Sequence, residues 1–254
     1  MHKIQALRAH KPGTVRRCEL VRNTAANEDT LYVYGTIGAD FWGDGIAAQD
    51  VAANLAASKA DTVHLRINSP GGDVFEGVAM AQAIRDFPGT VVAHVDGLAA
   101  SAATFLTTAA DQTLMAKGSM LMVHNAWTIA MGNAEDLLKQ AALLEKIDGQ
   151  IAQQYADRAG VDLAAARAWM TAETWFTDQE AVDAKLADGM QGDDNADENA
   201  KASIGKWALA DAPFANVPAA LMPESGTNAP EHGTTDVEPA NESFERAQRH
   251  ARLL

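Results

Sequence analysis

The stretch from Gly97 to Ala103 contains a serine, Ser101, at a point where a strand is expected to give way to a helix. An apolar run ends at Val95-Asp96, Gly97 permits a sharp turn, and most neighbours of Ser101 are alanines. The free N–H groups in the first turn of a helix can stabilise the oxyanion that forms when a serine attacks a carbonyl. A tightly packed structural helix start would contain the same residues, so this stretch alone leaves both readings open.

His124 is the best-placed candidate for a general base. It directly follows the apolar run Met120–Val123, at the expected end of a strand. A neutral imidazole at that position can accept a serine proton and return it to a leaving amine, although a lone histidine beside a strand is often structural. The other histidines lie near the ends, in the C-terminal segment or within strands: His2, His10, His64, His94, His232 and His250.

Two further features could complete such a site. Gly71 and Gly72 follow the expected strand 62–68 directly after Ser69-Pro70, and adjacent glycines let a backbone approach a ligand closely. A structural turn is the alternative, and the spacing is not that of a nucleotide-binding loop. Glu173 precedes the aromatic pair Trp175-Phe176 and could orient the imidazole, or it could be an ordinary surface carboxylate.

The elements that would position these residues alternate between strands and helices. This order predicts an α/β domain with parallel pairing and right-handed crossovers. The expected strands are residues 31–37, 62–68, 90–95, 112–115 and 120–123, and the expected helices are residues 45–58, 74–86 and 99–110.

The later part of the chain is more helical. Asn133 is expected to cap a long helix that runs to about residue 159, with an apolar stripe that includes Leu137, Leu144 and Ile151. A second helix is expected over residues 163–170. Thr177 and Glu180 match a capping box for a third helix that ends near residue 188.

Composition sets the broad class of the protein. The chain has 254 residues, of which 47% are apolar, and a formal net charge of −14. This argues against a nucleic acid or an anionic membrane as partner. Cys18 is the only cysteine, so no intramolecular disulfide and no cysteine-based metal site is expected. We identify no signal peptide or membrane span in the sequence, which favours a soluble, cytoplasmic protein.

A change of composition near residue 190 predicts two parts. Residues 191–254 contain five of the eight prolines, eleven acidic and five basic residues. Such a segment buries too little apolar surface to offset its ordering entropy. We therefore predict one globular domain over residues 1–190 and a mostly disordered acidic tail over residues 191–254.

Four motifs together resemble the ClpP family of serine peptidases, in the same order and at similar spacings. They are Ile67-Asn68-Ser69-Pro70-Gly71-Gly72, Gly97-x-Ala99-Ala100-Ser101-Ala102, Met122-Val123-His124-Asn125 and Trp175-Phe176-Thr177-x-x-Glu180-Ala181-Val182. The likeness covers roughly residues 28–190. It implies the ClpP/crotonase spiral fold with a long protruding helix, polypeptide substrates, a ring-like homo-oligomer, and no metal or cofactor.

The resemblance also implies roles for individual residues. Ser101 would be the nucleophile and His124 the general base, while Gly72 and Ala102 would supply the oxyanion-hole N–H groups. Where the family has an aspartate, this chain has Glu173, which is one methylene longer. Asp162 and Asp178 remain alternatives for that third position.

The acidic extension resembles that of ClpP-related head maturation proteases of tailed phages, which would act in the host cytoplasm or the immature head. Alternatives are a ClpP subunit working with an ATP-dependent unfoldase, a crotonase-like acyl-CoA enzyme, or a non-enzymatic capsid scaffold with a vestigial protease domain. A Ser/Lys dyad peptidase is disfavoured because His124 is in register with the family motif.

Overall fold

The computed structural model describes residues 16–38, 45–192 and 214–218. Most of the expected tail, including its predicted disorder, lies outside these residues. The division at residue 190 therefore stays a prediction.

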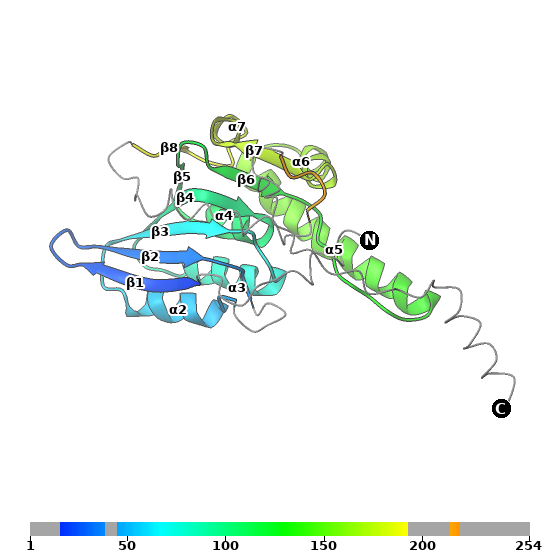
Figure 1. Ribbon diagram of the computed structural model, residues 1–254, viewed down its shortest axis with the longest axis horizontal. Coiled ribbons are helices and arrows are strands. Elements are labelled where there is room, and N and C mark those ends of the chain that lie inside the picture. The colour runs from blue at the N-terminus through cyan, green and yellow to red at the C-terminus, as the bar shows by residue number, and fades with distance from the viewer. Residues whose placement is uncertain (1–15, 39–44, 193–213, 219–254) are drawn as a thin grey trace, which may run out of the picture. The chain divides into compact units, whose positions relative to one another are not determined.

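The described residues form a mixed α/β structure around an eight-stranded sheet with the order β1-β2-β3-β4-β5-β8, in which β6 pairs with β4 and β7 (Figure 1). The strands are β1 Arg17–Asn23, β2 Glu28–Tyr34, β3 Thr62–Ser69, β4 Thr90–Ala100, β5 Gln112–Met115, β6 Met120–Val123, β7 Thr174–Thr177 and β8 Gly189–Met190. The pairs β2·β3, β3·β4, β4·β5, β4·β6 and β5·β8 are parallel, whereas β1·β2 and β6·β7 are antiparallel. The predicted α/β class with parallel pairing is confirmed.

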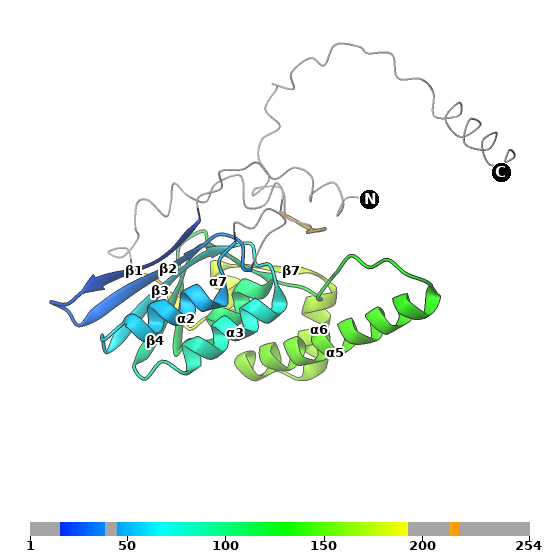
Figure 2. The same ribbon diagram turned by 90° about the horizontal axis from the view of Figure 1, so that it is seen from below.

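Two helices pack side by side against one face of the sheet (Figure 2). They are α2 (Ala48–Ala57) and α3 (Val74–Arg85), and both follow strands as crossover connections. The Asp73 side chain caps α3 by accepting the N–H groups of Phe75 and Glu76. This cap makes α3 begin directly after Gly71-Gly72, which fixes the end of the glycine turn.

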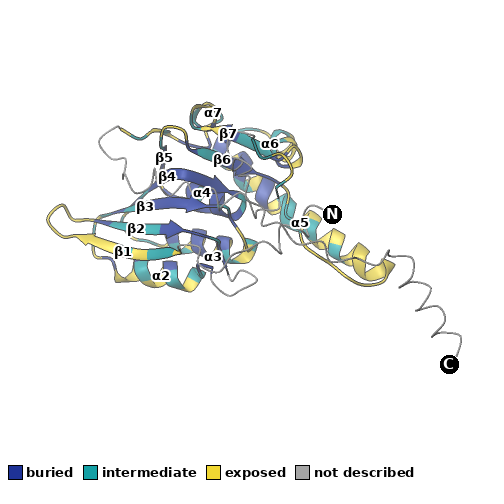
Figure 3. Cartoon of the chain, viewed as in Figure 1, coloured by how far each residue is buried: buried dark blue, intermediate teal, exposed yellow. Residues whose placement is uncertain are grey.

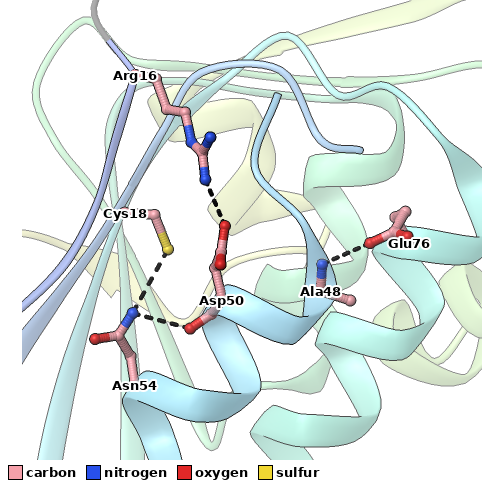
Figure 4. Close-up of polar contacts among 6 residues, drawn as sticks. All are labelled: Arg16, Cys18, Ala48, Asp50, Asn54 and Glu76. Carbon is pink, nitrogen blue, oxygen red and sulfur yellow. Dashed lines mark hydrogen bonds and ion pairs between the residues drawn. The ribbon is translucent and has the colours of Figure 1, made fainter. Parts of the chain in front are cut away.

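Polar contacts fix α2 to its neighbours on both sides (Figure 4). On one side, the Arg16 side chain pairs with Asp50, and the Asn54 amide lies 3.8 Å from the Cys18 sulfur. On the other side, the Ala48 N–H donates to a Glu76 carboxylate oxygen at 2.5 Å. The edge strand β1, the helix α2 and the helix α3 are thereby linked.

The strand β4 is longer than the sequence predicts. It continues to Ala100, whereas a strand over residues 90–95 and a helix from residue 99 were expected. It pairs with β5 as far as Val95 and then with β6 from Leu98 to Ala100. The expected sharp turn at Gly97 is therefore wrong, because hydrogen bonding to β6 and burial on both faces override the helix propensity of alanine.

The helix that follows β4 begins later and is shorter than predicted. A single 3-10 turn, η1 (Ser101–Ala103), leads into α4 (Thr104–Ala109).

The three remaining helices among the described residues begin where the sequence predicts. They are α5 (Ala134–Ala159), α6 (Leu163–Thr171) and α7 (Asp178–Asp183). The cap expected at Asn133 is present as a full capping box, and the capping box expected at Thr177 is present as well. The expected extent of α7 to residue 188 is wrong, because a turn follows Asp183. The strands β1, β7 and β8 were not predicted.

Only the C-terminal part of α5 belongs to the core (Figure 3). Ile151, Ala152 and Tyr155 are buried, whereas Leu137 and Leu138 are 45% and 70% exposed. Ile151 therefore packs inside its own domain and is not part of an exposed stripe. None of the helices within residues 16–38, 45–192 and 214–218 is both long and apolar enough to cross a membrane.

The buried His94 in β4 gives a prediction about acid stability. Burial, together with the nearby Arg66 and His64, lowers the pKa of His94 from 6.5 to about 3. Between these two values the unfolded chain binds a proton that the folded protein does not, so the free energy of unfolding falls as the pH is lowered. We expect this residue to account for about 2 kcal/mol of the loss between pH 7 and pH 5.

The measurement is urea unfolding of the wild type and His94→Gln at pH 7 and pH 5. The variant should lose less stability on acidification, because carboxylates titrate equally in both proteins. An equal pH dependence in the two proteins would show that His94 is not held neutral.

Candidate active site

The Ser101 hydroxyl and the His124 imidazole lie in hydrogen-bonding contact, with 2.7 Å between Oγ and Nε2. The two residues follow the carboxyl ends of neighbouring parallel strands, since β4 ends at Ala100 and β6 ends at Val123. His124 is buried, with 7% of its surface exposed. The structure thus brings together the two side chains that the sequence suggests as nucleophile and base.

The Ser101 backbone has an unusual conformation that directs the side chain. Its φ is +52°, in the left-handed region that non-glycine residues rarely adopt. Thr104 stabilises this turn. Its hydroxyl donates to the Ser101 carbonyl at 2.6 Å and lies 2.5 Å from the buried Tyr155 hydroxyl of α5. Strain of this kind persists where the surroundings fix it, and it is frequent at catalytic nucleophiles.

The glycine turn lies directly against Ser101. Gly71 has φ +87°, and a Cβ there would come within 2.8 Å of the Ser101 Cβ and 2.9 Å of the Ala102 nitrogen. Only glycine allows this approach. The structure therefore brings the Gly71-Gly72 turn next to the first turn after β4, as the resemblance implies.

Among the residues that the structure describes, the local backbone pairing does not use the N–H groups of Gly72 and Ala102. Ile37 bridges the turn by donating to the Gly71 carbonyl at 2.8 Å and accepting from the Asp73 N–H at 2.9 Å, so the Gly72 N–H takes no part in this bridge. The Ala102 N–H lies in the first turn of η1, where no preceding turn supplies an acceptor. Both groups are suited to an oxyanion beside Ser101.

Glu173 lies next to His124 through the pairing of β6 with β7. Val123 pairs with Thr174 in this antiparallel ladder. His124 follows Val123 and Glu173 precedes Thr174, so the two residues lie at the next position beyond the paired strands. Glu173 is 9% exposed and has φ +49°, at the turn where α6 ends. Glu173 is therefore not an ordinary surface carboxylate exposed to solvent.

The two alternative acids have other partners. The Asp162 side chain caps α6 by accepting the Ala165 N–H at 2.7 Å. The Asp178 side chain accepts the Gly118 N–H at 2.7 Å, next to the end of β6 that is remote from His124. The strand register thus favours Glu173.

A short segment that the sequence did not suggest also lies at this site. The Phe214 ring contacts His124 and Trp175 edge to face, with 5.5 Å between ring centroids in each case. The N–H groups of Ala215 and Asn216 both donate to Glu173 Oε1 at 2.7 Å. The available signal was an apolar pair, Phe214 and Val217, between two prolines of a polar segment.

Within the described ranges, no group of three or more histidine, cysteine or acidic side chains is arranged to hold a metal ion. The chemistry that the arrangement supports is acyl transfer by a hydroxyl nucleophile. A strained serine, a hydrogen-bonded imidazole, a buried carboxylate and two N–H groups are the parts that serine hydrolases use.

Comparison with known proteins gives the family. The Clp protease family model matches residues 15–193, and the chain belongs to this family. It is 28% identical over 147 residues to ATP-dependent Clp protease proteolytic subunit 1 of Leifsonia xyli, a match that covers 56% of this chain and 75% of that protein. It is 30% identical over 162 residues to the proteolytic subunit of Ligilactobacillus salivarius, covering 63% and 81% respectively. The protein is a serine-type peptidase with a fold consistent with that of ClpP.

The contact between the glycine turn and the serine gives a second prediction. A methyl group at Gly71 would meet the Ala100 carbonyl oxygen at 2.5 Å as well as Ser101. We expect Gly71→Ala to displace Ser101, to reduce peptidase activity by at least about 100-fold and to lower the melting temperature.

Gly118→Ala is the matched control, because Gly118 also has a positive φ, +81°, but nothing lies within 4 Å of its added methyl group. It should lower the free energy of unfolding only by the strain of alanine at a positive φ, about 1–2 kcal/mol, and it should retain activity. Similar activity in the two variants would mean that the turn does not position Ser101.

Proposed function

We propose that this protein is a serine endopeptidase in which Ser101, His124 and Glu173 form the catalytic triad and Gly72 and Ala102 form the oxyanion hole. The observation that carries the proposal is the 2.7 Å contact between Ser101 Oγ and His124 Nε2. The buried position of Glu173 beside His124 supports its role in orienting the imidazole.

In this mechanism Ser101 Oγ attacks the carbonyl carbon of the scissile peptide bond while its proton passes to His124 Nε2. The N–H groups of Gly72 and Ala102 stabilise the oxyanion of the tetrahedral intermediate. The C–N bond then breaks, and His124 gives its proton to the leaving amine. Water, deprotonated by His124, then attacks the Ser101 ester. The bond between the acyl carbon and Ser101 Oγ breaks, His124 returns the proton to Oγ, and the new carboxyl terminus is released.

The test is active-site labelling combined with peptide hydrolysis. A fluorophosphonate should form one adduct, located at Ser101 by mass spectrometry. Ser101→Ala and His124→Ala should each reduce kcat by about 10⁴-fold or more, and the double variant should lose little further, because the two residues act as one unit. Normal cleavage by folded Ser101→Ala would exclude the mechanism.

We further propose cleavage of scaffold or capsid polypeptides during phage head maturation, in the host cytoplasm or the immature head. The acidic, proline-bearing sequence after residue 190 supports this reading. The alternative is a proteolytic subunit that an ATP-dependent unfoldase supplies with substrate, and the names of the relatives favour it. Cleavage of a co-expressed scaffold protein without nucleotide would support the former, whereas ATP-dependent degradation with a co-purifying unfoldase would support the latter.

A vestigial protease domain within a capsid scaffold is the non-enzymatic alternative. The contact between Ser101 and His124 argues against a protease domain that has lost its activity.

The proposal includes a ring-like homo-oligomer joined through α5. The exposed apolar side chains near the N-terminal end of this helix support it, since Leu137, Leu138 and Leu143 are 45%, 70% and 46% exposed. Large exposed apolar side chains within a short stretch of one helix, here residues 137–143, are typical of protein interfaces.

We therefore expect the double variant Leu137→Asp, Leu138→Asp to sediment as a smaller species than the wild type at micromolar concentration. Burying two new carboxylates in an interface costs several kcal/mol. Lys139→Ala on the same helix removes only an exposed ion pair with Glu135 and should sediment like the wild type. A monomeric wild type would contradict the oligomer proposal.

A further inference from the structure

The segment Phe214–Val217 covers one apolar face of the part of the sheet in which β4, β6 and β7 pair, next to the proposed triad. This face is formed by Leu98, Ala100 and Met122, which are buried apart from the main core. Phe214 and Val217 pack against it, beside Trp175 of β7. In Figure 1 the segment, drawn in orange, lies beside β7. The contact is apolar and lies on β4 and β6, the strands that end directly before Ser101 and His124.

The backbone of the same segment binds one carboxylate oxygen. The N–H groups of Ala215 and Asn216 both lie 2.7 Å from Glu173 Oε1, and the Asn216 side-chain amide donates to the Ala172 carbonyl at 3.2 Å. Two short N–H bonds to one carboxylate oxygen fix the direction of the carboxylate. Since these bonds take up Oε1, the orientation of the second oxygen is fixed as well.

The aromatic ring adds a constraint on the histidine itself. Phe214 meets the imidazole of His124 at an interplanar angle of 85°. An edge-to-face contact of this kind is favourable and limits rotation of both rings. One segment thus touches the proposed base and the proposed orienting acid simultaneously.

Resting on the proposed triad, we propose that Phe214–Val217 is a positioning clamp for Glu173 and His124. Glutamate has one more rotatable bond than aspartate, so its carboxylate needs more constraint to hold an imidazole in place. Ala215 and Asn216 supply that constraint through their N–H groups, and Phe214 anchors them on the sheet. The clamp acts on turnover through Glu173 and His124 and does not itself touch substrate.

The test uses full-length variants that remove one element of the clamp each. Ala215→Pro deletes one N–H donor to Glu173, and Phe214→Ala removes the anchor ring. Each should lower kcat about 10- to 100-fold with little change in KM, because misplacement by a fraction of an ångström to about 1 Å has this effect. Phe214→Leu, which keeps an apolar anchor, should recover most of the lost activity.

The decisive comparison repeats Ala215→Pro in a Glu173→Gln background. If the N–H donors act through the Glu173 carboxylate, Ala215→Pro should lower kcat less than about threefold in the Glu173→Gln background, where that carboxylate is absent. Circular dichroism and thermal unfolding check that each variant is folded. Equal losses of kcat in the two backgrounds would show a general structural role and overturn the proposal.

Two other outcomes also decide the matter. Higher kcat in Phe214→Ala or Ala215→Pro would identify the segment as an inhibitory strap, and unchanged kcat would show that it is dispensable. Both outcomes overturn the clamp while leaving the triad intact, provided that the fluorophosphonate still labels Ser101. Failure of the wild type to be labelled at Ser101 would instead overturn the proposed function on which the clamp rests.

Discussion

The change of partner along β4 is the constraint on which the rest of the site depends. As far as Val95 this strand pairs with β5, and from Leu98 it pairs with β6. Because β6 ends one residue before His124, this second pairing brings His124 to Ser101. Without it, the two side chains would follow unconnected strands.

The point of divergence is fixed by a buried polar network. Asp96, 4% exposed, accepts a hydrogen bond from the Tyr34 hydroxyl at 2.7 Å and pairs with Arg66, whose Nη2 lies 2.6 Å from Oδ1. Breaking such a pair on one side leaves an uncompensated buried charge, which costs about 3–5 kcal/mol. The network therefore fixes β2, β3 and β4 relative to one another one residue before Gly97, where β4 leaves β5.

Much of this arrangement could be predicted from local sequence. The cap at Asn133, the capping box at Thr177 and the apolar strand 62–68 are short-range signals, and the structure has the corresponding elements there. The extension of β4 could not be predicted in this way, because Leu98-Ala99-Ala100 favours helix locally and becomes strand only through pairing with β6. The strand β7 was missed for a similar reason, since four residues with no alternating pattern are defined by their partner.

The same reasoning explains which parts of the site the sequence indicates. Ser101, His124 and the two glycines lie in recognisable motifs, and the structure brings them together. The Phe214–Val217 segment contacts Glu173 from about forty residues away in sequence, with no periodic pattern that would link the two. Contacts of this kind depend on tertiary structure, so composition alone assigns the segment to a tail.

The two departures from the family pattern are then connected in the proposed site. A glutamate in place of the aspartate lengthens the side chain, and sequence beyond residue 190 supplies the two N–H groups that hold it. A carboxylate fixed by the β6–β7 ladder alone would have its backbone constrained but three side-chain torsions free. The amides of Ala215 and Asn216 remove that freedom at the far end of the side chain, where the imidazole must be held. If the clamp acts as proposed, residues up to Val217 belong functionally to the catalytic domain, beyond the change of composition at residue 190.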